Sequence, residues 1–98
     1  MNKWRKKPIV IEAVRWTGTD ESWNEVKEFT KDLLNLNDYR KDKIKCRDKN
    51  IFIETLEGMM AANINDWIIK EPFPTGDRDF YPCKPDIFEQ TYELIEGE

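Results

Sequence analysis

The sequence predicts an α+β fold: a small curved antiparallel sheet or half-barrel of about five to six short strands, with one amphipathic helix over residues 22–34 packed on it. Two observations lead to this class. One segment of the 98-residue chain has helical periodicity. Most other apolar segments alternate with polar residues or end at turn residues. A parallel sheet is not expected, because each parallel pair needs a long crossover connection, usually a helix.

The first strand and the helix follow one another near the N-terminus. A strand is expected over residues 7–17, which are rich in β-branched side chains. Ser22 as the N-cap and Glu25 three residues later fit a capping box at the start of the helix, and a polar connection over 35–42 follows the helix. The apolar stripe of the helix consists of Trp23, Val26, Phe29, Leu33 and Leu34.

The second half of the chain is expected to form mainly strands. Residues 43–47 alternate between basic and apolar side chains, and the turn residues at 48–50 lead into a return strand over 51–55, which completes a hairpin. One helical turn is expected from Pro85, a residue suited to the first position of a helix. Further ordered segments are expected at 59–63, 67–70, 80–81 and 92–95.

Composition and charge indicate one small domain. The chain has a mass of 11.8 kDa, a net charge of −4, and four Trp, three Tyr and five Phe for its core. Residues 1–50 carry 13 basic and 9 acidic side chains, whereas residues 51–98 carry 3 basic and 11 acidic ones. We expect the two halves to attract each other within one folded surface. The acidic total argues against nonspecific DNA binding.

Several classes of chemistry are excluded by residues that the chain lacks. It has no His, so His-based triads and His metal ligands are excluded. Cys46 and Cys83 are far apart and are expected to be free thiols in a reducing compartment. We expect no metal and no cofactor, because two distant Cys do not form a zinc site and four scattered glycines do not form a phosphate loop.

Neither a membrane span nor a signal peptide is expected. No stretch approaches the roughly 18 apolar residues of a membrane span, and the basic start lacks a long apolar region. We therefore expect a cytoplasmic protein.

The densest basic patch is a candidate binding site for an anion. Lys43, Lys45 and Arg47 fall on one face of their strand, and a row of cations suits a phosphate-bearing ligand. Trp4, on the basic N-terminal arm, is the aromatic residue expected to be exposed and able to stack on a nucleotide ring. The simpler interpretation, which we favour, is an edge strand protected from aggregation by its lysines.

The string Tyr81-Pro82-Cys83-Lys84-Pro85-Asp86 is the most unusual motif in the chain. Its prolines fix the backbone around Cys83, and Lys84 beside the thiol could lower its pKa and produce a reactive thiolate. Thiol catalysis generally also needs a base, however, and His is absent. We favour a rigid turn that packs Tyr81, Ile87 and Phe88 into the core, with Asp86 as an acid in an early helical position.

Four strings together resemble one known family. They are R-K-K-P-I-V-I-E-A-V-R-W at 5–16, T-L-E-G at 55–58, N-D-W-I-I-K at 65–70 and Y-P-C-K-P-D-I-F-E-Q-T-Y-E at 81–93. They are similar to motifs of a family of small uncharacterised proteins from tailed phages and prophages of bacteria. Asn65 stands where that family usually has Gly, and Asn tolerates left-handed turn geometry. The resemblance implies a phage origin and the host cytoplasm, and it implies no chemistry.

The leading functional interpretation is a small non-enzymatic phage accessory protein that binds a host or phage protein. It follows from the small size, the lack of a catalytic constellation and the abundance of aromatic residues that suit an interface. An alternative from another class is a protein that binds or sequesters an anionic nucleotide through the basic strand. An enzyme that acts through Cys83 or through carboxylates is the third and least favoured interpretation.

Overall fold

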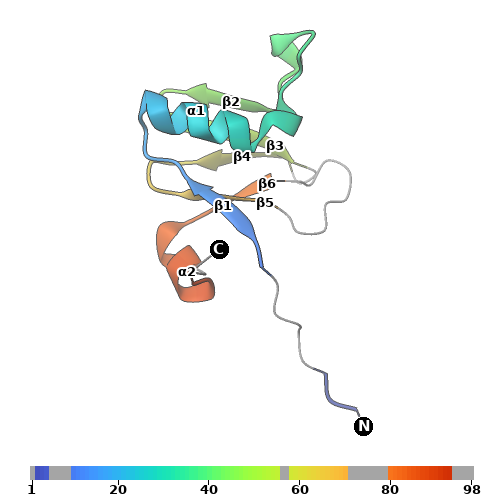
Figure 1. Ribbon diagram of the computed structural model, residues 1–98, viewed down its shortest axis with the longest axis vertical. Helices are drawn as coiled ribbons and strands as arrows, with labels where there is room; N and C mark the ends of the chain where they lie inside the picture. The colour runs from blue at the N-terminus through green and yellow to red at the C-terminus, as the bar shows by residue number, and fades with distance from the viewer. Residues whose placement is uncertain (1, 5–9, 56–57, 71–79, 94–98) are drawn as a thin grey trace.

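The chain forms two three-stranded antiparallel sheets and two α-helices, which confirms the expected α+β class. The computed structural model describes residues 2–4, 10–55, 58–70 and 80–93 (Figure 1). The first sheet has the strand order β1-β5-β6, and the second has the order β2-β3-β4. The strands are β1 (Glu12–Arg15), β2 (Ile44–Arg47), β3 (Asn50–Thr55), β4 (Gly58–Ala62), β5 (Trp67–Lys70) and β6 (Phe80–Cys83).

The expected hairpin is present between β2 and β3. Ile44 is paired with Ile53, and Arg47 is paired with Asn50. Asp48 and Lys49 form the two-residue turn, with φ angles of 53° and 64°. Both angles are positive, which is the geometry that matches the right-handed twist of a hairpin. Asn65 likewise has a φ of 79°, as expected for a residue at a left-handed turn position.

Helix α1 (Asp20–Phe29) is shorter than the helix expected over 22–34 and begins earlier. Its N-cap is Thr19, whose side chain accepts a hydrogen bond from the Ser22 N–H at 3.1 Å. The prediction of Ser22 as N-cap is therefore wrong. The Ser22 hydroxyl instead lies within the first turn and bonds the end of β1, donating to the Arg15 carbonyl at 3.1 Å.

Thr30 ends the helix earlier than the apolar periodicity predicts. Its hydroxyl donates to the Val26 carbonyl at 2.7 Å, and its backbone leaves the helical region at φ −106° and ψ 26°. Such back-bonding by a β-branched hydroxyl residue competes with helix continuation. A 3-10 turn, Lys31–Leu33, follows and still delivers Leu33 to the core.

The C-terminal region also differs from expectation. The single turn expected at Pro85 is a seven-residue helix, α2 (Pro85–Thr91), and the strand expected over 92–95 is not present at Tyr92. Residues 94 and 95 lie outside the described residues, as do residues 7–9 of the first expected strand. Ile87, expected in the core, is 54% exposed, because α2 turns this side chain outward.

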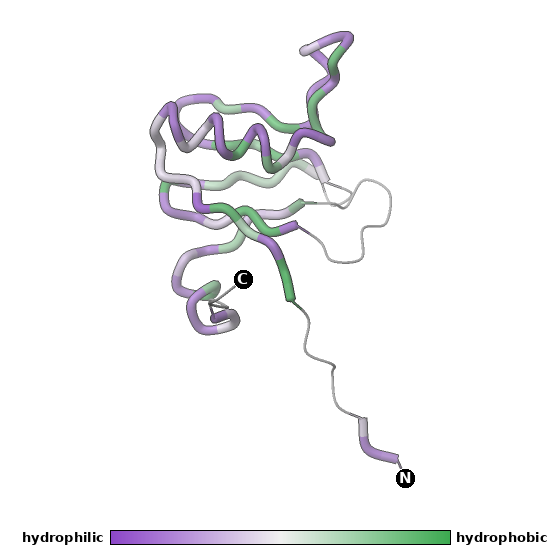
Figure 2. The backbone as a smooth tube through the Cα atoms, viewed as in Figure 1, coloured by the Kyte–Doolittle hydropathy of each residue, from purple (hydrophilic) through white to green (hydrophobic). Residues whose placement is uncertain are grey.

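The main core lies between the two sheets and α1. Its buried residues come from β1, from β5 and β6, from the hairpin, from β4, and from the helix and its following turn. Figure 2 shows hydrophilic and hydrophobic residues alternating along α1, so one side of the helix serves the core. None of the described helices is long and apolar enough to span a membrane. The core residues are Val14, Trp16, Val26, Leu33, Ile44, Ile51, Ile53, Ala62, Ile68 and Phe80.

Candidate functional site

The basic strand β2 is an edge of the second sheet, and its solvent side carries Lys45 and Arg47. Phe52 of β3 is paired with Lys45. Because paired residues share one face of an antiparallel sheet, the ammonium group and the half-buried ring are neighbours there. Lys43 immediately precedes the strand, and its N–H donates to the Leu33 carbonyl at 2.8 Å. This face therefore offers cations and one aromatic ring to an anion.

The structure does not bring Trp4 to the basic strand. Its side chain is 91% exposed, and residues 2–4 lie at the N-terminal end of the molecule, far from β2 (Figure 1). Phe52, which the sequence analysis did not single out, is the aromatic residue beside the cations. The strand pairing that places it there depends on the register of the hairpin.

The motif at 81–86 spans the end of β6 and the start of α2. Tyr81 lies on β6 opposite Ile69, and Asp86 is an exposed residue in the first turn of α2. Lys84 is the N-cap of α2, and its Nζ donates to Asp66 Oδ2 at 2.9 Å. The Asp66 side chain is only 4% exposed, so this ion pair joins the turn before β5 to the helix.

A ring stack reinforces the same junction. The Phe88 ring of α2 lies 4.2 Å from the Trp67 ring of β5 between centroids, with an interplanar angle of 7°. Asp66 immediately precedes Trp67, and Lys84 lies one helical turn before Phe88, so the ion pair and the stack join the same two segments. Two of the four strings that carry the family resemblance thus contact each other and hold α2 against the first sheet.

The environment of Cys83 opposes thiolate formation. Burial raises the pKa of its thiol, and the negative charges of Asp66 and Asp86 raise it further. Lys84 directs its ammonium to Asp66 instead of serving the thiol. Cys46 behaves alike, because desolvation and the charge of Asp20 raise the pKa of its thiol. Both thiols are therefore protonated at neutral pH and are poor nucleophiles.

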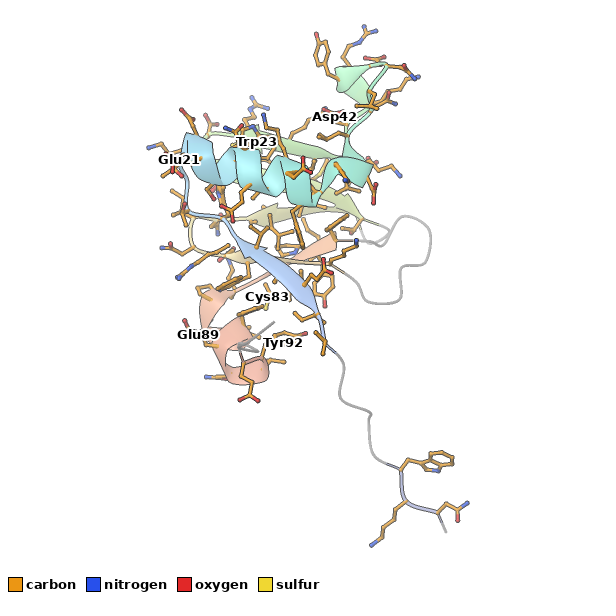
Figure 3. All side chains as sticks on the ribbon, in the orientation of Figure 1. Glu21, Trp23, Asp42, Cys83, Glu89 and Tyr92 are labelled. Carbon is orange, nitrogen blue, oxygen red and sulfur yellow. The ribbon has the colours of Figure 1, made fainter. Side chains whose placement is uncertain are left out.

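A projecting loop, residues 35–42, extends from the body of the molecule between α1 and β2 (Figure 1). From the sequence, this segment is expected to be a polar connection. Two of its apolar side chains are strongly exposed, Leu36 at 98% and Tyr39 at 78%. Asp42 lies at the base of the loop (Figure 3), and the hydrogen bond from the Lys43 N–H to the Leu33 carbonyl closes that base.

Local hydrogen bonds hold the projecting loop in one shape. Asn35 Oδ1 accepts from the N–H groups of Asn37 and Asp38 at 2.9 and 3.0 Å. Asp42 Oδ1 accepts from the Asn35 N–H at 2.6 Å. The Asn and Asp residues at 35, 37, 38 and 42 are residues that form such turns, so their clustering was the available sequence signal.

Asp38 and Arg40 form the charged part of the projecting loop. Asp38 Oδ1 accepts from both the N–H and the Nε of Arg40, each at 3.0 Å. These two hydrogen bonds hold the pKa of the Asp38 carboxyl below its ordinary value. The loop consequently carries an Arg40–Asp38 ion pair next in sequence to the exposed Tyr39.

The described residues contain no group of three or more His, Cys, Asp or Glu side chains placed to hold a metal ion. Comparisons with protein-family models, with curated proteins and with solved structures find no match to this chain.

Proposed function

We propose that this chain is a non-enzymatic protein-binding domain and that the projecting loop is its contact site. The observation that carries the proposal is the strong exposure of Leu36 and Tyr39 on a loop whose backbone is held by side-chain hydrogen bonds. An exposed leucine and tyrosine on one loop offer apolar area that a partner surface can remove from water. Tyr and Arg are also the residue types that dominate binding energies at protein interfaces, and Arg40 lies beside Tyr39.

The fixed shape of the loop favours affinity. The turns at Asn35 and Asp38 restrict the backbone before any partner arrives. Binding therefore loses less conformational entropy than it would with a freely moving loop. The raised pKa of the Cys83 thiol supports the non-enzymatic part of the proposal, since it removes the one candidate nucleophile of the sequence motif.

We further propose a phage or prophage accessory protein that acts in the host cytoplasm on a host or phage protein. The four strings at 5–16, 55–58, 65–70 and 81–93 support this origin through their resemblance to the phage family. In the fold two of these strings serve the junction of α2 with the sheet. The projecting loop lies outside all four strings. Its sequence can therefore vary among family members that bind different proteins.

The test is a double variant, Leu36→Ala with Tyr39→Ala, used in a quantitative pull-down from bacterial lysate. Proteins bound by the native chain are expected to lose affinity for the variant by about tenfold or more, because two central contacts are truncated. The matched control is Met59→Ala with Ile87→Ala, which truncates side chains that are 63% and 54% exposed elsewhere. Equal retention by the loop variant and the native chain would contradict the proposal.

A further inference from the structure

Strand β1 has an unpaired edge. It is the outer strand of the first sheet, and the Trp16 N–H donates toward β5, to the Asp66 carbonyl at 2.9 Å. Backbone groups alternate in direction along an antiparallel strand, so those of Ala13 and Arg15 point away from β5. Of these, the Arg15 carbonyl accepts from the Ser22 hydroxyl. The described residues give no partner to the Arg15 N–H or to either backbone group of Ala13.

A cavity of about 380 Å³ lies beside this edge, between β1 and the first turns of α1. Ala13 and Arg15 line one side, and Glu21 and Glu25 of α1 line the other. Glu21 lies at the start of α1, with its side chain at the surface (Figure 3). The cavity is thus open to solvent where the strand edge is unpaired.

The charge around the cavity is negative. Glu21 and Glu25 are exposed, and no ion pair joins either of them to another described residue. The one cation in the lining is Arg15, so the lining has two carboxylates and one guanidinium. The Arg15 Nε donates to the Asn65 carbonyl at 3.4 Å, and its guanidinium carbon lies 5.7 Å from the centroid of the Trp67 ring, which also lines the cavity. The carboxylates of Glu21 and Glu25 therefore have no cationic partner among the described residues.

We propose that the β1 edge binds an extended basic peptide segment of another protein. The segment adds a strand beside β1 through the Arg15 N–H and both backbone groups of Ala13, and it directs a Lys or Arg side chain into the cavity toward Glu21 and Glu25. Main-chain hydrogen bonds supply affinity in such strand addition, and the pocket for an alternate side chain supplies specificity. This surface is separate from the projecting loop and does not depend on the function proposed there.

Charge complementarity indicates that the bound segment is basic. A neutral or acidic strand would leave the two glutamates without a counter-charge, and an acidic one would add repulsion. Edge strands elsewhere in this chain are guarded differently, since β2 carries exposed Lys45 and Arg47. Strand β1 carries one exposed acidic and one exposed basic side chain, Glu12 and Arg15, and no lysine, so its edge lacks the row of cations that lies along β2.

The experiment uses the whole chain and a synthetic capped peptide of alternating Thr and Val with one central Lys. Amide chemical shifts are followed by NMR up to about 1 mM peptide. The expected result is a saturable shift at the amides of Ala13 and Arg15. A peptide with Glu in place of Lys, and one N-methylated along one edge, are each expected to bind at least about fivefold more weakly.

Two variants test the two parts of the site. Glu21→Gln with Glu25→Gln is expected to weaken Lys-peptide binding by about fivefold. Its matched control, Glu28→Gln, removes a carboxylate on the same helix that pairs with Lys31 at 3.9 Å, and it should leave binding within about twofold. Ala13→Pro removes the outward N–H from an edge position that tolerates proline, and it should abolish the shifts.

Other outcomes overturn the proposal. Absence of shifts, shifts centred outside β1 and α1, or equal binding of the Lys and Glu peptides would each do so. If Ala13→Pro fails to fold, the N-methylated peptide still decides whether main-chain pairing is used, because equal binding of that peptide excludes it. Sedimentation of the chain without peptide tests whether a second copy of the chain occupies the β1 edge. A dimer that becomes a monomer in the Ala13→Pro variant would show this and would overturn the proposal.

Discussion

Lys84 and Asp66 form the best-buried ion pair among the described residues. Their 2.9 Å contact joins a half-exposed ammonium to a carboxylate that is almost wholly buried. Asp66 also accepts from the Asn63 N–H through the same Oδ2, at 2.8 Å. Burial raises the pKa of the neighbouring Cys83 thiol most, and the charges of Asp66 and Asp86 raise it further. Asp66 thus contributes, together with burial and Asp86, to a protonated cysteine.

At the residue scale we predict slow alkylation of Cys83. In the native chain at about pH 7.5, iodoacetamide should modify Cys83 several-fold more slowly than in the chain unfolded by urea, because the thiolate is the reacting species. Mass spectrometry of peptide digests taken over time measures both rates.

Cys46 serves as the internal control for this measurement. It is exposed, whereas Cys83 is half-buried, so Cys46 should react faster than Cys83 in the native chain. Native Cys83 that reacts faster than the unfolded chain would mean an activated thiolate and would restore the enzymatic interpretation.

The projecting loop is the element on which the proposed function depends. Its shape comes from side chain to backbone hydrogen bonds made within the loop, with Asn35 and Asp38 as the acceptors. The loop buries little apolar surface, since Leu36 and Tyr39 are exposed. Its order therefore depends on polar groups and, for Asp38, on charge.

At the element scale we predict that acid disorders this loop. The pKa of Asp38 in the folded chain lies below the ordinary aspartate value of about 3.9. A lowered pKa stabilises the folded loop at pH values above the ordinary one. This contribution is lost as the pH falls through the lowered pKa. The N–H and Nε signals of Arg40 should hold constant from about pH 7 to about pH 5 and then move toward random-coil positions in NMR spectra.

The control for the pH prediction is Asp38→Asn, which keeps a side-chain acceptor but has no titrating charge. Its Arg40 signals should show a weaker pH dependence below about pH 4. Identical titration of the Arg40 signals in the variant and the native chain would assign the transition to another group.

The molecule as a whole is held by one core that both sheets share. Ile53 of the second sheet and Ile68 of the first are both fully buried in the same cluster. Val26 of α1 belongs to it as well, so neither sheet has a separate main core. Small domains with one shared core usually unfold in a single cooperative transition.

At this scale we predict that core changes in either sheet act on one transition. Ile53→Val and Ile68→Val should each lower the free energy of unfolding by about 0.5–1.5 kcal/mol, with an unchanged dependence on urea concentration. Urea titrations followed by far-UV circular dichroism and by Trp fluorescence should coincide for each variant.

The matched control is Ile87→Val, at a residue that is 54% exposed. It should change the free energy of unfolding by less than about 0.5 kcal/mol. Two separate transitions, with each valine substitution moving only one of them, would show that the sheets unfold independently.

Most elements and their order follow from signals between residues that are close in the chain. The alternation over 43–47 and the turn at 48–50 predicted the β2–β3 hairpin, because both signals act between residues close in the chain. Turn chemistry likewise accounts for Asn65, with its φ of 79°. Local periodicity predicted a C-terminal end of the helix that lies too far along the chain. The apolar pattern does not include the hydrogen bond of the Thr30 hydroxyl that accompanies the end of α1.

Which side chains contact each other and which stay exposed depends on the packing of the whole chain. The Lys84–Asp66 pair, the stack of Phe88 on Trp67 and the unpaired edge of β1 each depend on strands or helices brought together from distant parts of the chain. The exposure of Tyr39 depends on the direction in which its loop leaves the core. Local sequence patterns reflect interactions between residues a few positions apart. The contacts and the exposure of a side chain are set by how the whole chain packs.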